Sequence, residues 1–229
     1  TTSITAESLS IATENLAGGS EARKSSAVAA QGGSTLEINV SDKLDITNND
    51  QNGTSAINAQ ENSKIDIKGT ADIDINGNVY GESLATEANS KIGIEGNNVT
   101  ITSNAGQDSD ADTAGVIENT SIIAQGKVVL TATGNQAGIG VRSDAGHDAE
   151  NSIKAKEIEI NSAKSFGVYA NDFGWDTVGT VNHVTLDAEK ITINSEKDGI
   201  QSMNGAVIDI KNFDELKIKS NEQGINSEY

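Results

Sequence analysis

Four of the seven aromatic residues of this chain lie within ten consecutive positions: Phe166, Tyr169, Phe173 and Trp175. Exposed aromatic rings stack on sugar rings or anchor protein interfaces. Tyr169 is expected to point outward, because its two neighbours are apolar and successive residues of a strand point to opposite sides. Phe173 and Trp175 lie in a longer polar segment, where they either contact a ligand or fold back to cover their own loop.

Histidines and carboxylates flank the same region. His147 and His183 border two neighbouring polar segments, and imidazole groups beside carboxylates hold transition metals or act as acid and base. The two histidines lack the spacing of a ligand pair such as His-x-x-x-His, so exposed loop histidines are the alternative interpretation. The residues predicted to contact a ligand are Tyr169, Phe173, Trp175, Asp172, Asp176 and His147.

A second candidate site is acidic. Asp108, Asp110 and Asp112 alternate in a segment that also contains glycine. Such carboxylates can converge on Ca²⁺, which takes about six to eight oxygen ligands. The segment is not an EF-hand, because its sixth position lacks glycine and Asn119 stands where the last glutamate belongs. A solvated acidic loop is the alternative, and no other cofactor is predicted.

The usual signatures of catalysis are missing from the sequence. It has no cysteine and no Gly-x-Ser-x-Gly motif, and its two arginines, Arg23 and Arg142, are far apart. The acidic residues expected on outer strand faces are Glu37, Asp45, Asp66, Asp74, Glu159 and Asp209. We expect them to be distributed over the faces rather than gathered in one or two repeats. The sequence therefore favours a binding protein over an enzyme, and the alternative is a polysaccharide lyase or hydrolase.

The composition excludes some partners. A formal net charge of −18 in 229 residues repels nucleic acid and anionic membrane surfaces. The absence of cysteine excludes disulfides and thiolate metal sites. No segment approaches the ~20 apolar residues of a membrane-spanning helix. Low aromatic content and high charge are typical of disorder, but the aliphatic residues occur in short alternating runs that favour strands.

One pattern recurs about eight times: two aliphatic residues flank one polar residue, and a short polar run follows. Its copies are Leu9/Ile11, Leu44/Ile46, Ile73/Ile75, Val99/Ile101, Val128/Leu130, Ile158/Ile160, Ile191/Ile193 and Leu216/Ile218. The pairs that precede them are Ile4/Ala6, Leu36/Ile38, Ile65/Ile67, Ile92/Ile94, Ile122/Ala124, Ile153/Ala155, Val184/Leu186 and Ile208/Ile210. The small–aliphatic steps that follow them are Ala27-Val28, Ala56-Ile57, Ser83-Leu84, Gly115-Val116, Gly138-Ile139, Gly167-Val168, Gly199-Ile200 and Gly224-Ile225.

Each repeat therefore contains three short strands with one apolar face, which it cannot bury alone. If each repeat is one turn of a coil, equivalent strands pair in parallel ~4.8 Å apart and their aliphatic residues stack along the axis. Asn62, Asn89 and Asn119 each precede an inward aliphatic residue by three positions, which suggests a stacked corner. We predict a single domain over residues 1–229, an all-β, right-handed parallel β-helix of about eight three-strand turns with inserted loops. A left-handed or irregular solenoid is the alternative.

Four gaps between the expected strands are longer than the others, and loops of this kind often carry the function of a solenoid. They run over residues 11–28, 101–116, 139–153 and 168–184. The last two fall in adjacent turns and are expected to protrude side by side from one corner. Neither end of the chain carries an evident polar cap, so further coils are expected to flank this segment.

The phrases KLDITNN, KITINSEKDGIQS and LKIKSNEQGIN, with turns rich in Asn, Ser, Thr and Gly, resemble the passenger regions of Gram-negative autotransporters (type V secretion). The resemblance extends over nearly the whole chain. It implies export through an outer-membrane barrel, a place at the cell surface or release from it, and an adhesin-like role. The implied partners are a host-cell or bacterial surface ligand, either glycan or protein, or a second copy of the protein in biofilm formation.

Overall fold

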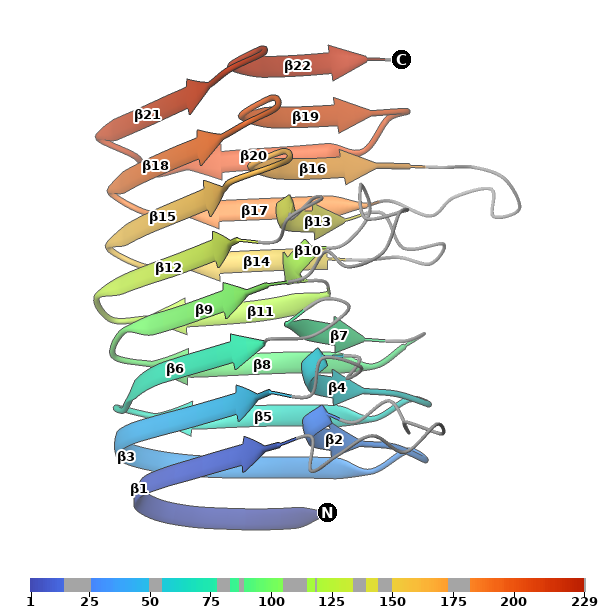
Figure 1. The fold of residues 1–229 in the computed structure, drawn as a ribbon, viewed down its shortest axis with the longest axis vertical. Helices are drawn as coiled ribbons and strands as arrows, with labels where there is room; N and C mark the ends of the chain where they lie inside the picture. Colours follow the sequence, from blue (N-terminus) through green and yellow to red (C-terminus); the bar gives the residue numbers. More distant parts are fainter. Residues whose placement is uncertain are drawn as a thin grey trace.

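The protein is an all-β parallel solenoid built from two parallel sheets. The computed structural model describes residues 1–14, 26–49, 55–77, 83–86, 89–104, 115–117, 119–133, 139–143, 150–172 and 182–228. Every strand pairing in this part of the chain is parallel, and the strands stack along the long axis from β1 to β22 (Figure 1). The predicted parallel β-solenoid fold is therefore confirmed.

The strands form three ladders, which we call first, second and third in the order in which one repeat runs through them. The first ladder contains β5 (Lys64–Gly69), β8 (Lys91–Gly96), β11 (Thr120–Ala124), β14 (Glu150–Lys154), β17 (His183–Asp187) and β20 (Val207–Lys211). The second contains β6 (Asp72–Gly77), β9 (Val99–Ser103), β12 (Lys127–Ala132), β15 (Glu157–Ser162), β18 (Lys190–Ser195) and β21 (Glu215–Ser220). The third contains β2 (Ser26–Ala30), β4 (Ser55–Ala59), β7 (Leu84–Thr86), β10 (Gly115–Ile117), β13 (Ile139–Ser143), β16 (Val168–Asn171), β19 (Ile200–Met203) and β22 (Ile225–Glu228).

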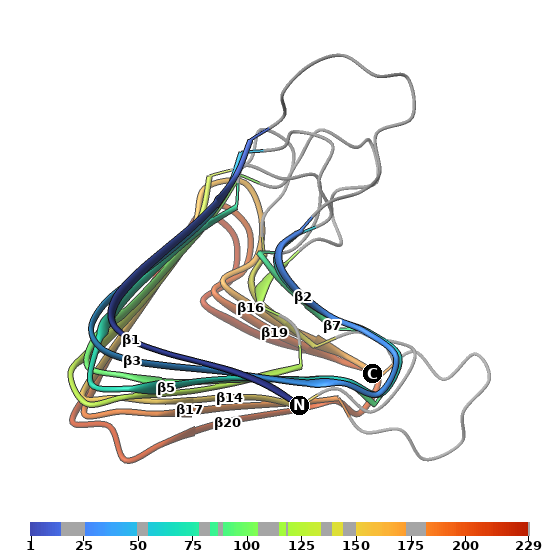
Figure 2. The same ribbon diagram turned by 90° about the horizontal axis from the view of Figure 1, so that it is seen from below.

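Two long strands join the first and second ladders into one 14-stranded sheet. They are β1 (Thr2–Thr13) and β3 (Thr35–Asn48), and each passes around the corner between the ladders without interruption. The start of β3 pairs with β5 and its end pairs with β6. Seen along the axis, the two ladders form two sides of the coil and the separate 8-stranded third ladder forms the remaining side (Figure 2). The sequence predicted two separate strands here in every repeat.

The core is a column of aliphatic side chains. In the second ladder every predicted pair stacks on the next, as Ile75 does on Ile101 and Ile160 on Ile193. These four side chains are fully buried. Complete burial of an isoleucine side chain contributes about 1.5–3 kcal/mol. A single repeat has no second apolar surface, so this burial exists only because successive repeats cover one another.

The first ladder departs from the predicted alignment by two residues at three places. The structure pairs Ile4 with Ile38, Ile94 with Ile122, and Ile153 with Leu186. A shift of two residues keeps every side chain on its own face, so alternation alone cannot detect it. As a result two polar residues, Thr120 and Asn151, occupy inward positions opposite Ile92 and Val184 and are completely buried.

The third ladder contains two further corrections. Ile117, rather than Val116, pairs with Leu84, and Val141, rather than Ile139, pairs with both neighbours. The reason is the same freedom of register, here in short strands whose flanking segments are long. The predicted alignments Val28 to Ile57 to Leu84 and Val168 to Ile200 to Ile225 are confirmed.

The predicted asparagine corner is confirmed for Asn62 and Asn89, which occupy equivalent positions in successive turns, but not for Asn119. Asn62, Asn89 and Asn119 all have positive φ, at 62°, 59° and 45°. Asparagine tolerates this left-handed conformation better than most residues. After the first two, the backbone N–H of Ser63 donates to Ser90 Oγ at 3.1 Å, which ties one turn to the next. Asn119 lies two positions further along the corner, because of the shift in register at β11.

A glycine ladder lies at the start of the third strands. A Cβ added to Gly167 would lie 2.3 Å from Ile193 Cγ2 and 2.6 Å from the carbonyl oxygen of Gly199. The same close approach exists at Gly140 and Gly199. The small–aliphatic step of this repeat is therefore Gly140 followed by Val141, and not Gly138 followed by Ile139 as predicted. Only glycine lets the backbone pass this close to the core and to the next turn.

The four long gaps fall mainly on residues 15–25, 105–114, 144–149 and 173–181, which lie outside the described residues. The strands that flank these gaps are the predicted ones. The first two gaps lie between a second and a third strand, and the other two lie between a third strand and the next first strand. Within the described part of the chain, no helix has the length and hydropathy needed to cross a membrane.

Candidate functional site

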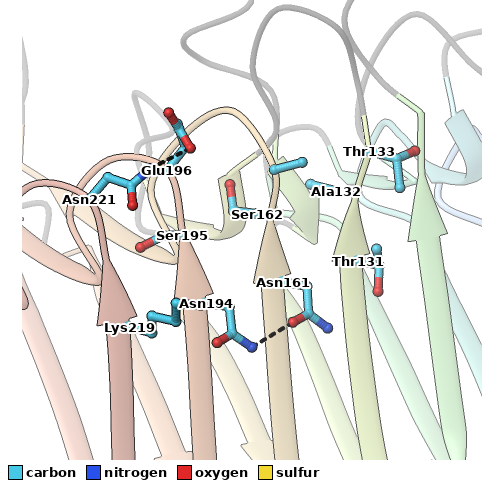
Figure 3. Close-up of a pocket in the computed structure, with 11 residues that line it drawn as sticks. Thr131, Ala132, Thr133, Asn161, Ser162, Asn194, Ser195, Glu196, Lys219 and Asn221 are labelled. Carbon is cyan, nitrogen blue, oxygen red and sulfur yellow. Dashed lines mark hydrogen bonds between the residues drawn. The ribbon is translucent and has the colours of Figure 1, made fainter.

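A groove of about 340 Å³, lined mostly by residues of polar type, crosses the ends of β12, β15, β18 and β21. It lies at the corner where the second strands end and the chain turns toward the third ladder (Figure 3). Asn161 and Asn194 form its centre, and Thr131 and Lys219 continue the same row on the outer strands. The parallel register brings these residues together, although they are about 30 residues apart in sequence.

The two amides of this row have fixed orientations. Asn194 Nδ2 donates to Asn161 Oδ1 at 2.8 Å, and Asn161 Nδ2 donates to Glu159 Oε1 at 3.0 Å. Each bond uses one of the two N–H donors of an amide, and an amide oxygen can accept two hydrogen bonds. The amides of Asn161 and Asn194 therefore keep further donors and acceptors for a ligand. Orientation in advance lowers the entropy that the protein loses when it binds a ligand.

Glu159 is itself held by a lysine. Lys127 Nζ lies 2.6 Å from Glu159 Oε2 and 3.1 Å from Glu157 Oε1. The hydrogen bond from Lys127 holds the pKa of Glu159 below its ordinary value and that of Glu157 likewise, while Glu159 raises the pKa of Lys127. Both carboxylates are therefore ionised at neutral pH. The network fixes Glu159 as the acceptor that orients Asn161.

The rim of the groove carries charged and hydroxyl groups. Asn221 Nδ2 donates to Glu196 Oε2 at 2.7 Å, and Ser195 Oγ donates to the carbonyl oxygen of Lys197 at 3.0 Å. Figure 3 shows Asn221 and Glu196 above the Asn161–Asn194 row. Amides, hydroxyls and a carboxylate around a shallow groove match the alternating donors and acceptors of a polyol. They offer no nucleophile paired with a base.

The aromatic cluster lies on the same corner. The backbone N–H of Ser165 donates to Ser162 Oγ at 3.3 Å, and that of Lys197 donates to the Ser165 carbonyl at 3.1 Å. Phe166 follows directly and stacks on Tyr169, with ring centroids 5.2 Å apart and planes at 27°. Lys197 Nζ lies 5.1 Å from the centroid of Phe166, within range of a cation–π contact.

Tyr169 lies on the outer face of the third ladder, as expected, while Val168 and Ala170 are buried. Asn171 Nδ2 donates to its hydroxyl at 2.9 Å, and the hydroxyl donates to Met203 Sδ at 3.6 Å. Tyr169 is only half-buried. These contacts hold one edge of the ring while part of its surface reaches solvent.

The other predicted ligand contacts are only partly described. Asp172 follows β16, is half-buried, and its backbone N–H donates to the Met203 carbonyl at 3.2 Å. The remaining predicted ligand contacts and calcium ligands lie outside the described residues: Phe173, Trp175, Asp176, His147, Asp108, Asp110 and Asp112. Within the described ranges, no group of three or more His, Asp or Glu side chains is placed to hold a metal ion.

The outward acids are less dispersed than expected. Glu37 is next to Asp66 in the first ladder, and Asp45 is next to Asp74 in the second. Four of the six expected acids therefore fall in two neighbouring repeats, although on different sides of the coil. His183, which the sequence assigned to a loop, begins β17, and its Nε2 lies 3.1 Å from Asp209 Oδ2.

The Asn161–Asn194 row was missed because asparagine after a strand is ordinarily a turn residue. A signal was present, since EIEINS and KITINS place asparagine at the same position after the second inward isoleucine. Comparison with protein-family models, with curated proteins and with solved structures found no match to this chain.

Proposed function

We propose that this chain is an adhesin-like recognition segment that binds a glycan at the corner between its second and third ladders. The observation that carries the proposal is the pre-oriented amide row of Asn161 and Asn194 in a groove lined mostly by residues of polar type, with the Phe166–Tyr169 pair on the same corner. Neutral amides and hydroxyls select sugar hydroxyls, and an aromatic face selects the apolar side of a sugar ring.

The proposed location is the surface of a Gram-negative cell, or a released form of the same protein, and it is supported by the resemblance of the sequence to autotransporter passengers. In this proposal the coil is right-handed and has about eight turns, one for each strand of the third ladder. A long coil separates the binding corner from the cell. The formal net charge of −18 keeps such a rod soluble and opposes binding to anionic lipid or nucleic acid.

Glycan-array binding tests the proposal, followed by titration of the best ligand against wild type and the double variant Asn161→Ala/Asn194→Ala. The variant should bind the glycan at least roughly ten-fold more weakly, because it lacks two uncharged amide groups that are already oriented for hydrogen bonding. Asn76→Ala is a matched control, because Asn76 occupies the same row on β6 away from the groove. Circular dichroism and thermal melting check that the variants fold.

Three results count against the proposal. Equal affinity of the Asn161→Ala/Asn194→Ala protein and the wild type would exclude this groove as the glycan site. Release of reducing ends or unsaturated sugars from a bound polysaccharide would indicate an enzyme. Concentration-dependent dimerisation in sedimentation, without glycan binding, would support self-association in place of glycan recognition.

A further inference from the structure

A second groove, of about 370 Å³, lies on the outer face of the first ladder across β5, β8, β11 and β14. Its floor is a row of small residues, Gly93, Ser121 and Ser152, which the parallel register places side by side. Larger side chains stand on both sides of this row in the adjacent turns. The groove is therefore a consequence of three small residues at equivalent positions of successive repeats.

One end of this first-ladder groove is cationic. Lys64 and Lys91 are direct neighbours in register, an arrangement of like charges that destabilises a sheet. Asp66 compensates one of them, with Oδ2 at 2.7 Å from Lys64 Nζ and a side chain that is only 9% exposed. A Cβ at position 93 would lie 3.0 Å from Asp66 Oδ1, so Gly93 leaves space for that carboxylate. Lys91 has no ion pair among the described residues.

The opposite end is anionic. Glu150 begins β14, is exposed, and forms no ion pair within the part of the chain that the structure describes. Asn119 lies between Lys91 and Glu150 in the same row, one strand from each. Two strand spacings separate the charges along the axis, which corresponds to ~10 Å. Among the described residues, the groove therefore has one uncompensated positive end and one uncompensated negative end.

We propose that the first-ladder groove binds a short peptide with free termini. Its carboxylate pairs with Lys91, its ammonium group pairs with Glu150, and its amides bond to Asn119 and to the hydroxyls of the floor. An extended chain spans ~3.3–3.6 Å per residue, so about three residues match the separation of the charges. This site is on a different face from the glycan site and does not depend on it.

The test is a titration of the 229-residue protein with triglycine at low ionic strength, followed by NMR shifts or calorimetry. N-acetyl-triglycine lacks the ammonium group, and triglycine amide lacks the carboxylate. Each capped peptide should bind roughly three- to five-fold more weakly, as expected for loss of one exposed ion pair. Lys91→Gln should weaken triglycine but not triglycine amide further, and Glu150→Gln should weaken triglycine but not its acetylated form further.

Two exposed residues of the same ladder provide matched controls. Lys211→Gln and Glu95→Gln remove the same charges outside the groove and should leave triglycine affinity unchanged. The proposal is overturned if the capped peptides bind as well as triglycine, or if no titration shows saturable binding. It is also overturned if glucuronic acid, a carboxylate without an ammonium group, binds at least as tightly as triglycine. Loss of triglycine binding in the control variants would also overturn it, because bulk charge would then explain the effect.

Discussion

Asn151 Oδ1 accepts a hydrogen bond of 3.1 Å from the backbone N–H of Thr120 inside the coil, where both side chains are completely buried. This contact links β11 to β14 at a level where the neighbouring turns place aliphatic residues. Buried polar groups are tolerated when they are bonded, and are costly once a partner is removed. Asn151 is therefore a specific connection between two turns and not a defect of the core.

Replacement of Asn151 by alanine should lower the free energy of unfolding by about 1–3 kcal/mol, because it removes a buried hydrogen bond and leaves a small void. Urea unfolding monitored by circular dichroism measures the change. Ser152→Ala, at the adjacent outward position, is the control and should change stability by less than about 0.5 kcal/mol. Equal losses in the two variants would contradict a role for the inward amide.

The glycine ladder predicts a position-dependent cost of an added methyl group. Gly167→Ala should destabilise the protein by about 1–3 kcal/mol, because the new Cβ overlaps Ile193 and the Gly199 carbonyl. Gly224→Ala is its control, since the nearest atom there is Ile218 Cγ2 at 4.0 Å. Thermal unfolding of both variants tests the difference. Similar melting temperatures would mean that the backbone approach at Gly167 adjusts without cost.

The pairing of Lys127 with Glu159 predicts a pH-dependent contribution. Because Lys127 lowers the pKa of Glu159 in the folded state, the stabilisation from this pair is complete above the unfolded pKa of ~4.3 and is lost as the pH falls through the folded pKa. Glu159→Gln should lower stability at neutral pH by less than about 1 kcal/mol, since both groups are about one-third exposed. The difference from wild type in urea unfolding should disappear at low pH, and a pH-independent difference would refute the assignment.

The stacked rings of Phe166 and Tyr169 predict an energetic coupling. A double-mutant cycle with Phe166→Leu and Tyr169→Leu should give a coupling of about 0.5–1.5 kcal/mol, as found for aromatic pairs beyond their buried area. Unfolding experiments on the four proteins measure it. Strict additivity would show that the rings do not depend on each other, and would leave Tyr169 free to reorient toward a ligand.

The fold was predictable where aliphatic residues alternate without gaps. The register of the second ladder follows from the sequence, because similar polar residues surround each pair of aliphatic residues. The first ladder was not fully predictable, because pairing Ile122 with Ile94 or with Ile92 satisfies the same alternation. The choice between the two registers depends on whether Thr120 and Asn151 can form hydrogen bonds when they point into the core. Such bonds are visible only in the three-dimensional structure.

The candidate site was predictable in part. The outward direction of Tyr169 follows from alternation, but its contacts with Phe166, Asn171 and Met203 depend on the neighbouring turn. The amide row of Asn161 and Asn194 required the register of the second ladder, because each residue by itself resembles a turn asparagine. The predicted calcium ligands and most of the aromatic loop fall outside the described residues, and remain predictions.

Parallel pairing also sets the mechanical behaviour of the rod. The strands stack along the long axis (Figure 1), and the backbone hydrogen bonds between neighbouring strands run in the stacking direction, so tension applied at the two ends loads them one turn at a time. Ile160 and Ile193 are paired yet 33 residues apart in the chain. Peeling one such turn releases about 110 Å of extended chain at ~3.3–3.6 Å per residue. A coil of this design lengthens in successive steps under load and keeps its remaining turns intact.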